Sequence, residues 1–259
     1  EKFPEFKIAV NIFLYEKSNL LKNIQKKNID NKQVKWINNF SHLKKGPVIF
    51  FGNEFFDAIP IKQFYRNQGV LFQKYYSLEK DKNIIEIYKK ASSKDKLKIE
   101  KFKTLKNLRF IEFPKLGLDE LNKILKKISL LSGGLLLIDY GYLKNNSKNT
   151  LQSVINHKKN NLLDNLGKAD ITSLVNFKLL NEFFIQNRLK VKKVVTQKFF
   201  LERMGIIERA NSLSKNMNFK EQSNLYSRIQ RLLDIKLMGE LFKVIFAYKF
   251  KKDDFIGFK

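Results

Sequence analysis

The sequence contains no cysteine and only two histidines, His42 and His157. Disulfide bonds and thiolate metal sites are therefore excluded, and a histidine-based metal cluster is disfavoured. No apolar run approaches the roughly 20 residues that a membrane-spanning helix needs, and no signal-peptide pattern opens the chain. These absences predict a protein without a metal site or a membrane span, located in the cytoplasm or in a matrix-like interior.

Acidic residues are scarce beside basic ones, 25 against 51, which gives a formal net charge of +26 at pH 7. A charge of this size can attract nucleic acid or an anionic membrane. Only seven of the basic residues are arginine, however, the side chain best suited to phosphates and base edges. The lysines are also spread along the chain. We therefore predict a solvated lysine surface rather than a nucleic-acid face, and keep an RNA-modifying enzyme as an alternative.

Hydrophobic patterning predicts an α/β fold. Continuous apolar runs at 48–51 and 135–138 are typical of parallel strands buried on both faces. Residues 118–131 carry an apolar stripe at helical spacing. The order of strands and helices fits an open, mostly parallel, doubly wound sheet in a single domain spanning 1–259. Two further segments are predicted as additions to this sheet, an antiparallel hairpin insertion at 61–113 and a loop and helical insertion at 142–190.

Polar and acidic side chains follow three of the predicted strands. Glu16 follows the first strand, Asn53, Glu54 and Asp57 follow the second, and Asp139 and Tyr140 follow the third. In open parallel sheets, ligands bind beyond the carboxyl ends of the strands. One acidic residue in such a place is often only a helix cap or a solvated side chain. Three sets at equivalent positions favour a ligand crevice instead.

The residue types in this crevice indicate what it could bind. The Glu16 carboxylate suits the hydroxyl pair of a ribose, and Glu54 with Asp57 could hold a planar guanidinium or an ammonium group. No G-x-G-x-x-G loop, Walker sequence or serine-centred nucleophile elbow is present. The scarcity of cysteine and histidine also disfavours covalent catalysis.

The segment 53–64, NEFFDAIPIKQF, closely resembles the signature of the MidA-like family of class I S-adenosylmethionine-dependent methyltransferases. That family includes mitochondrial arginine methyltransferases of complex I assembly. Further blocks resemble the family in the same order along nearly the whole chain. They are 134–141, which ends in Asp-Tyr-Gly, then 150–157, 167–172, 197–206 and 238–244.

The resemblance implies a class I methyltransferase fold, S-adenosylmethionine as cofactor and methyl transfer to a protein side chain, with arginine as the acceptor. It also implies a respiratory complex I subunit as a partner, and adds the mitochondrial matrix as an alternative to a bacterial cytoplasm. The family's glycine-rich first turn, which holds the methionine part of the cofactor, is expected before residue 1. The chain is therefore expected to lack that turn.

On this basis each candidate residue receives an expected role. We assign cofactor binding to Glu16, Asn38, Asn39 and Asn53. Catalysis at the position of methyl transfer is assigned to Asn53, Glu54 and Asp57, and substrate binding to Asp139, Tyr140 and His157. Asn176 stands where the family has an aspartate, so no acid is assigned there. A catalytically inactive assembly factor or binding module on the same fold is the alternative to an enzyme, and the oligomeric state stays open.

Overall fold

The structure, a computed structural model, describes residues 3–80, 83–144, 147–156, 158–251 and 254–259. The chain divides into two compact units, Glu1–Gly46 and Pro47–Lys259. Each unit is described by itself. No helix among the described residues is both long and apolar enough to span a membrane.

The first unit is built around a strand–helix–strand crossover. Its elements are α1 (Pro4–Ala9), β1 (Ile12–Tyr15), α2 (Asn19–Asn28), β2 (Val34–Ile37) and the 3-10 helix η1 (Phe40–His42). The two strands pair in parallel, with Ile12 opposite Val34. Ser18 caps α2 by accepting a hydrogen bond from the Leu21 backbone N–H. This parallel pair brings the carboxyl ends of β1 and β2 to one edge.

The second unit contains a mixed central sheet. Its strands are β3 (Val48–Asn53), β8 (Gly133–Tyr142), β12 (Val175–Asn176), β13 (Lys190–Val191), β14 (Val195–Thr196) and β15 (Phe242–Lys249). β3 and β12 run parallel to β8, whereas β15 is antiparallel to β8, β13 and β14. The prediction of a mostly parallel sheet therefore fails on the β15 side, and these pairings do not establish a doubly wound arrangement.

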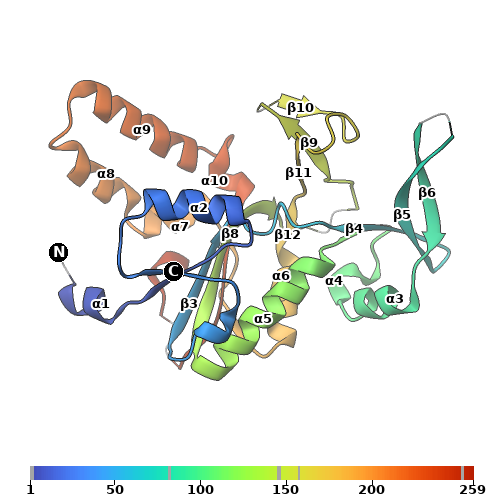
Figure 1. Cartoon of the computed structure of the whole chain (residues 1–259), viewed down its shortest axis with the longest axis horizontal. Coiled ribbons are helices and arrows are strands. Elements are labelled where there is room, and N and C mark those ends of the chain that lie inside the picture. The colour runs from blue at the N-terminus through green and yellow to red at the C-terminus, as the bar shows by residue number, and fades with distance from the viewer. Residues whose placement is uncertain (1–2, 81–82, 145–146, 157, 252–253) are drawn as a thin grey trace. The chain divides into compact units, whose positions relative to one another are not determined.

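Helices of the second unit pack on this sheet or on one another. They are α5 (Lys115–Leu131), α6 (Phe177–Gln186), α7 (Gln197–Arg203), α8 (Ile206–Ser214), α9 (Phe219–Leu233), α10 (Met238–Leu241) and the 3-10 helix η2 (Ile256–Phe258). α5 packs against β3, β8 and β15, and α6 packs against β8 and β15 (Figure 1). The apolar stripe predicted for α5 is buried at Leu121, Ile124, Leu125 and Ile128.

The two apolar strands β3 and β8 differ in burial. Leu135, Leu137 and Ile138 of β8 are buried, which confirms the prediction for that run. In β3, by contrast, Ile49 and Phe51 are 57% and 65% exposed. The prediction of burial on both faces is wrong for β3, because successive side chains point to opposite faces and only one face is covered.

The segment 61–113 forms a separate antiparallel sheet, as predicted. Its elements are β4 (Lys62–Asn67), β5 (Val70–Leu78), β6 (Ile84–Lys90), α3 (Ser93–Glu100), α4 (Lys103–Lys106) and β7 (Phe110–Phe113), with the strand order β6-β5-β4-β7. Gln68 and Gly69 join β4 to β5, and both have positive φ, 44° and 78°. This tight two-residue turn is the one that the Asn-Gln-Gly sequence predicted.

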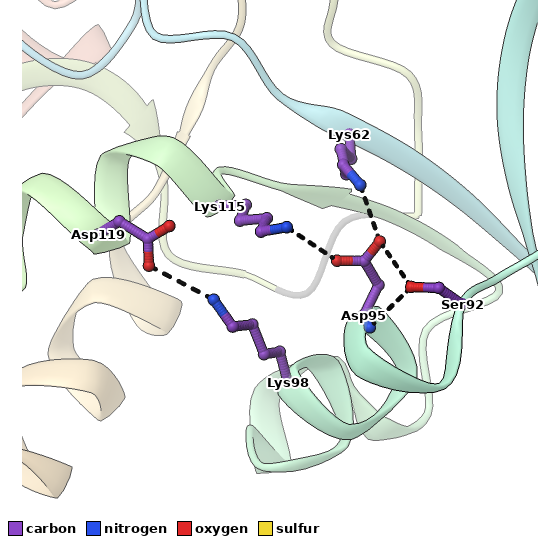
Figure 2. Close-up of polar contacts among 6 residues, drawn as sticks. All are labelled: Lys62, Ser92, Asp95, Lys98, Lys115 and Asp119. Atoms are coloured by element: carbon purple, nitrogen blue, oxygen red, sulfur yellow. Dashed lines mark hydrogen bonds and ion pairs between the residues drawn. The ribbon is translucent and has the colours of Figure 1, made fainter.

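A buried ion-pair cluster ties α3 to its surroundings (Figure 2). Asp95, only 3% exposed, lies one turn into α3 and accepts a hydrogen bond from the Lys62 ammonium at 2.7 Å. Lys115, at the start of α5, lies 3.5 Å from the other carboxylate oxygen, and the Ser92 hydroxyl donates at 3.1 Å. One carboxylate therefore joins β4, α3 and α5.

The segment 142–190 contains strands that the sequence did not predict. β9 (Gln152–Ile155), β10 (Lys158–Asn160) and β11 (Asp170–Thr172) form a three-stranded antiparallel sheet, with β9 in the centre. Thr172 of β11 lies opposite Gln152 of β9. The segment returns to the central sheet through β12 and continues into α6.

Candidate active site at the end of β3

The turn after β3 has a constrained backbone. The Glu54 N–H donates to the Ile138 carbonyl at 2.9 Å, which adds one hydrogen bond to the β3–β8 ladder. Glu54 itself has φ of +48°, in the left-handed region that glutamate rarely adopts. Backbone strain of this kind persists only where surrounding contacts over-determine the geometry, and it clusters at functional sites. Both Asn53 and Glu54 are exposed to solvent.

Asp139 on β8 holds this turn in place. Its Oδ2 accepts hydrogen bonds from the backbone N–H groups of Phe56 at 2.8 Å and Asp57 at 3.3 Å, and its Oδ1 accepts one from Tyr140 N–H at 2.9 Å. The side chain is only 2% exposed. Burial raises the pKa of Asp139 to about 7, the charge of Asp57 adds to this, and the three N–H donors oppose it.

Asp57, 7% exposed, is the second buried carboxylate of the site. Its Oδ2 accepts a hydrogen bond from the Tyr140 hydroxyl, whereas its Oδ1 is buried and has no hydrogen-bond partner. Among the described residues, no lysine or arginine pairs with Asp57 or Asp139. A buried carboxylate oxygen without a partner is costly, and a cationic group on a ligand would remove that cost.

A small cavity lies on the other side of Phe56, lined partly by Glu112, Tyr142 and Ser173. Its volume is about 20 Å³, which is room for about one water molecule. It is too small to take an amino-acid side chain, and Asp57 is not among the residues that line it. Burial also raises the pKa of Tyr142 to about 12, which keeps this phenol protonated.

The residues expected to hold the cofactor nucleoside lie in the first unit. Glu16 directly follows β1, and its carboxylate accepts hydrogen bonds from Ser18 N–H at 2.7 Å and from Gln25 Nε2 at 3.4 Å. Each carboxylate oxygen has two lone pairs, so Glu16 retains capacity for a ribose hydroxyl. Asn38 accepts from the Lys22 ammonium, and Asn39 caps η1. The assignment of these residues to the cofactor nucleoside stays a prediction, and Glu16 keeps the acceptor capacity that such a role needs.

The structure brings Asp57, Asp139 and Tyr140 into one hydrogen-bonded cluster, with Asn53 and Glu54 in the adjoining turn. His157 lies outside the described residues. Sequence reasoning missed the backbone N–H of Ser173, which donates to the Asp57 carbonyl at 3.2 Å, and the hydroxyl of Thr172, which bonds to Tyr140. The block 167–172 that resembled the family was the only signal pointing to this stretch.

Comparison with known proteins gives the family. Residues 1–195 match the model of a family of S-adenosyl-L-methionine-dependent methyltransferases. The chain belongs to this family. This confirms the resemblance seen in the sequence, and with it S-adenosylmethionine as the cofactor of the family.

Individual relatives are more distant. A Caenorhabditis elegans protein arginine methyltransferase NDUFAF7 homolog, mitochondrial, is 28% identical over 69% of this chain and 42% of its own length. The human protein arginine methyltransferase NDUFAF7, mitochondrial, is 24% identical over 81% of this chain and 47% of its own. The chain thus spans less than half of the length of these relatives.

A solved structure shares the fold. It is the crystal structure of a Burkholderia thailandensis protein bound to S-adenosyl-homocysteine, with a TM-score of 0.80 and 17% sequence identity. The similarity covers 99% of this chain and 68% of that one. At this level of identity the likeness establishes the α/β fold of the chain.

Proposed function

We propose that the protein transfers a methyl group from S-adenosylmethionine to a nitrogen of a protein side chain, with arginine as the acceptor. The observation that carries this proposal is the buried, unpartnered Oδ1 of Asp57 beside the strained turn at Glu54. Family membership supports the reaction and the cofactor. The names of the relatives support arginine as the acceptor.

Asp57 is the residue that acts on the acceptor nitrogen. S-adenosylmethionine supplies, when bound, a methyl group on a positively charged sulfur. The Oδ1 of Asp57 accepts an N–H of the guanidinium and so orients the nitrogen toward the site of transfer. The same oxygen receives the proton that the nitrogen loses, because a protonated guanidinium is a poor nucleophile. Burial of Asp57 excludes water from this proton transfer.

Glu54 supplies a second carboxylate three residues before Asp57, at the exposed side of the turn. We assign to Glu54 an ion pair with the cationic acceptor on the solvent-exposed side of the site. We assign to Asn53 a polar contact between cofactor and acceptor. The backbone N–H of Glu54 fixes the turn on β8 while the side chain stays accessible. Asp139 acts through the backbone of the turn and does not need to touch the substrate.

The test is methyl transfer by the full-length protein from tritiated S-adenosylmethionine to a library of 15-residue peptides, each with one central arginine. For each of these peptides, a control peptide has lysine in place of the arginine. The proposal expects label on arginine peptides, and a loss of at least tenfold in Glu54→Gln. Wild-type activity in Glu54→Gln would remove Glu54 from the mechanism. No transfer to any peptide, together with no binding of S-adenosylmethionine in calorimetry, would favour an inactive assembly factor.

The cellular setting follows from the relatives. We place the protein in the mitochondrial matrix in preference to a bacterial cytoplasm, because the relatives named above carry mitochondrial names. A subunit of respiratory complex I is the proposed substrate protein. The check is fractionation of the source cells. Recovery of the protein outside mitochondria would refute this placement, and steeply salt-dependent RNA binding would point to an RNA substrate instead.

A further inference from the structure

The Asp57 carboxylate stands at one end of a chain of hydrogen bonds that crosses three elements. Gln152 Nε2 on β9 donates to Thr172 Oγ1 on β11 at 3.2 Å. Thr172 in turn bonds to the Tyr140 phenol on β8, and the phenol donates to Asp57 Oδ2. None of these three uncharged side chains can ionise near neutral pH, so the chain is polar without adding charge.

The direction of these bonds is the same at each step. The Gln152 amide nitrogen is only a donor, so Thr172 Oγ1 must accept from it, which leaves the single Thr172 proton for Tyr140. The Tyr140 hydroxyl then donates its hydrogen bond to Asp57 Oδ2, because an ionised carboxylate can only accept. Hydrogen bonds aligned head to tail polarise one another, and here the alignment favours negative charge on Asp57.

The Tyr140 ring is held so that its hydroxyl cannot easily turn away. It makes an edge-to-face contact with Phe242 on β15, with centroids 5.4 Å apart. Burial, together with the hydrogen bond to Asp57, raises the pKa of Tyr140 above its usual value, so the phenol remains a donor. The backbone of Asp57 is fixed as well, by Ser173 N–H on its carbonyl and by Asp139 on its own N–H.

We propose that Tyr140 and Thr172 are positioning residues: Tyr140 takes one lone pair of Asp57 Oδ2, so that Oδ1, which has no hydrogen-bond partner, is the oxygen that binds the acceptor, and Thr172 couples the three-stranded sheet β9–β11 to the reacting acid. Sequence reasoning gave Tyr140 a substrate contact, which stays a prediction, and the geometry adds a hydrogen bond from its hydroxyl to Asp57 Oδ2. The inference rests on the proposed role of Asp57 in methyl transfer. It implies that a change at the base of β11 alters the reaction without touching the substrate.

The groups that can influence Asp57 are few. Asp139 and Tyr140 face it from β8, Glu54 lies in its own turn, and Thr172 with Ser173 are uncharged. Burial raises the pKa of Asp139 to about 7. A test that changes Tyr140 must therefore be read beside an Asp139→Asn variant, which removes that second titration.

The test compares Tyr140→Phe and Thr172→Val with the matched control Tyr142→Phe, which removes a phenol two residues along the same strand. In the peptide assay we expect kcat to fall roughly tenfold or more in Tyr140→Phe, since a hydrogen bond to a charged group is lost. The acid limb of the pH–rate profile moves to higher pH, and the KM for S-adenosylmethionine does not change. Thr172→Val lowers kcat and shifts the acid limb in the same directions but by less. Tyr142→Phe changes neither kcat nor the acid limb.

A second measurement does not depend on activity. Carbon-13 NMR of the Asp57 side-chain carboxyl follows its titration directly, in an Asp139→Asn background with and without Tyr140→Phe. The inference expects the midpoint to move to higher pH when the phenol hydroxyl is removed. An unchanged midpoint and pH profile in Tyr140→Phe would overturn it, as would equal effects in Tyr142→Phe. If wild-type protein transfers no methyl group, the proposed function fails while the NMR result still decides whether Tyr140 sets the state of Asp57.

Discussion

Two buried carboxylate sites in the second unit have opposite surroundings. Asp95 pairs with two lysines and accepts a hydrogen bond from a serine hydroxyl, whereas Asp57 and Asp139 accept hydrogen bonds from N–H groups and one phenol and have no cationic partner in the part of the chain that the structure describes. Burial alone would raise the pKa of Asp95, but hydrogen bonds from Lys62 and Ser92 and the charges of Lys62 and Lys115 lower it. Burial raises the pKa of Asp139 to about 7.

The difference separates a carboxylate that the fold pairs with cations from the one to which we assign the reaction. The Oδ1 of Asp95 also has no hydrogen-bond partner, but Lys115 lies 3.5 Å from it and Lys62 pairs with the other oxygen, so the fold supplies a cation to both oxygens of Asp95. Asp57 has one oxygen that the fold leaves without a partner. In the function proposed above, a cationic acceptor supplies the partner that this oxygen lacks.

The largest expected effect is on activity at Asp57. Asp57→Asn should lower kcat by roughly 100-fold or more, because the proton acceptor is lost, while the free energy of unfolding stays the same or rises. Asp95→Asn should leave the kcat of the folded protein unchanged. Methyl-transfer kinetics and urea unfolding of the two variants test this contrast, and it collapses if both lose activity equally.

The next effect is on stability at Asp95. Asp95→Ala should lower the free energy of unfolding by about 2 kcal/mol, because two lysines lose a buried partner but can still reach water. The control is Asp119→Ala, whose exposed pair with Lys98 at 3.4 Å appears beside the cluster in Figure 2 and should contribute less than about 0.5 kcal/mol. Equal losses in urea unfolding would mean that burial of Asp95 does not matter.

The pH dependence of stability should have opposite signs at the two sites. Asp139 is protonated in the folded state up to a pKa of about 7, but ionises near 3.8 when unfolded, so its contribution falls as the pH rises from about 4 to 7. The lowered pKa of Asp95 gives the reverse: its contribution is present above about pH 4 and is lost below. Unfolding measured from pH 3 to 8 for wild type, Asp139→Asn and Asp95→Asn should show both slopes.

The smallest effect concerns backbone strain at Glu54. Glu54→Gly should raise the free energy of unfolding by about 0.5 kcal/mol. Glycine adopts positive φ without the steric cost that glutamate has there, and this gain exceeds the additional conformational entropy that glycine loses on folding. Gln68→Gly, at φ of +44° in the β4–β5 turn, should gain similarly. Only Glu54→Gly should lose methyl transfer. A stabilised Glu54→Gly that keeps full activity would show that the strain serves no reaction.

Much of the reactive site could be predicted because it follows a general rule of sheets. The apolar run of β8 and the position of Asp139 after it predicted that this residue would meet the turn at Asp57, and the structure joins them. The hairpin at Gln68 was equally predictable, since its turn chemistry is local. The exposed face of β3 was not, because a short apolar run carries no information about which neighbours will cover it.

The structural site could not be predicted, because its partners are distant and its sequence is ordinary. Asp95 lies in a lysine-rich stretch that is typical of a solvated surface, and its burial depends on Lys62 and Lys115 from other elements. The bond from Thr172 to Tyr140 likewise arises from β9–β11, whose polar sequence gives no clear period-2 pattern. Long-range polar pairing of this kind is set by tertiary structure alone.

The hydrogen bond from Phe56 N–H to the Asp139 carboxylate joins residues 83 positions apart in the chain. During synthesis the turn at Asp57 therefore emerges from the ribosome long before β8 is available to hold it. Residues 61–113 can pair among themselves in that interval, since their sheet contains only nearby strands. The nascent chain should thus fold the sheet of 61–113 first, and the turn at Asp57 should stay unformed until β8 has been synthesised.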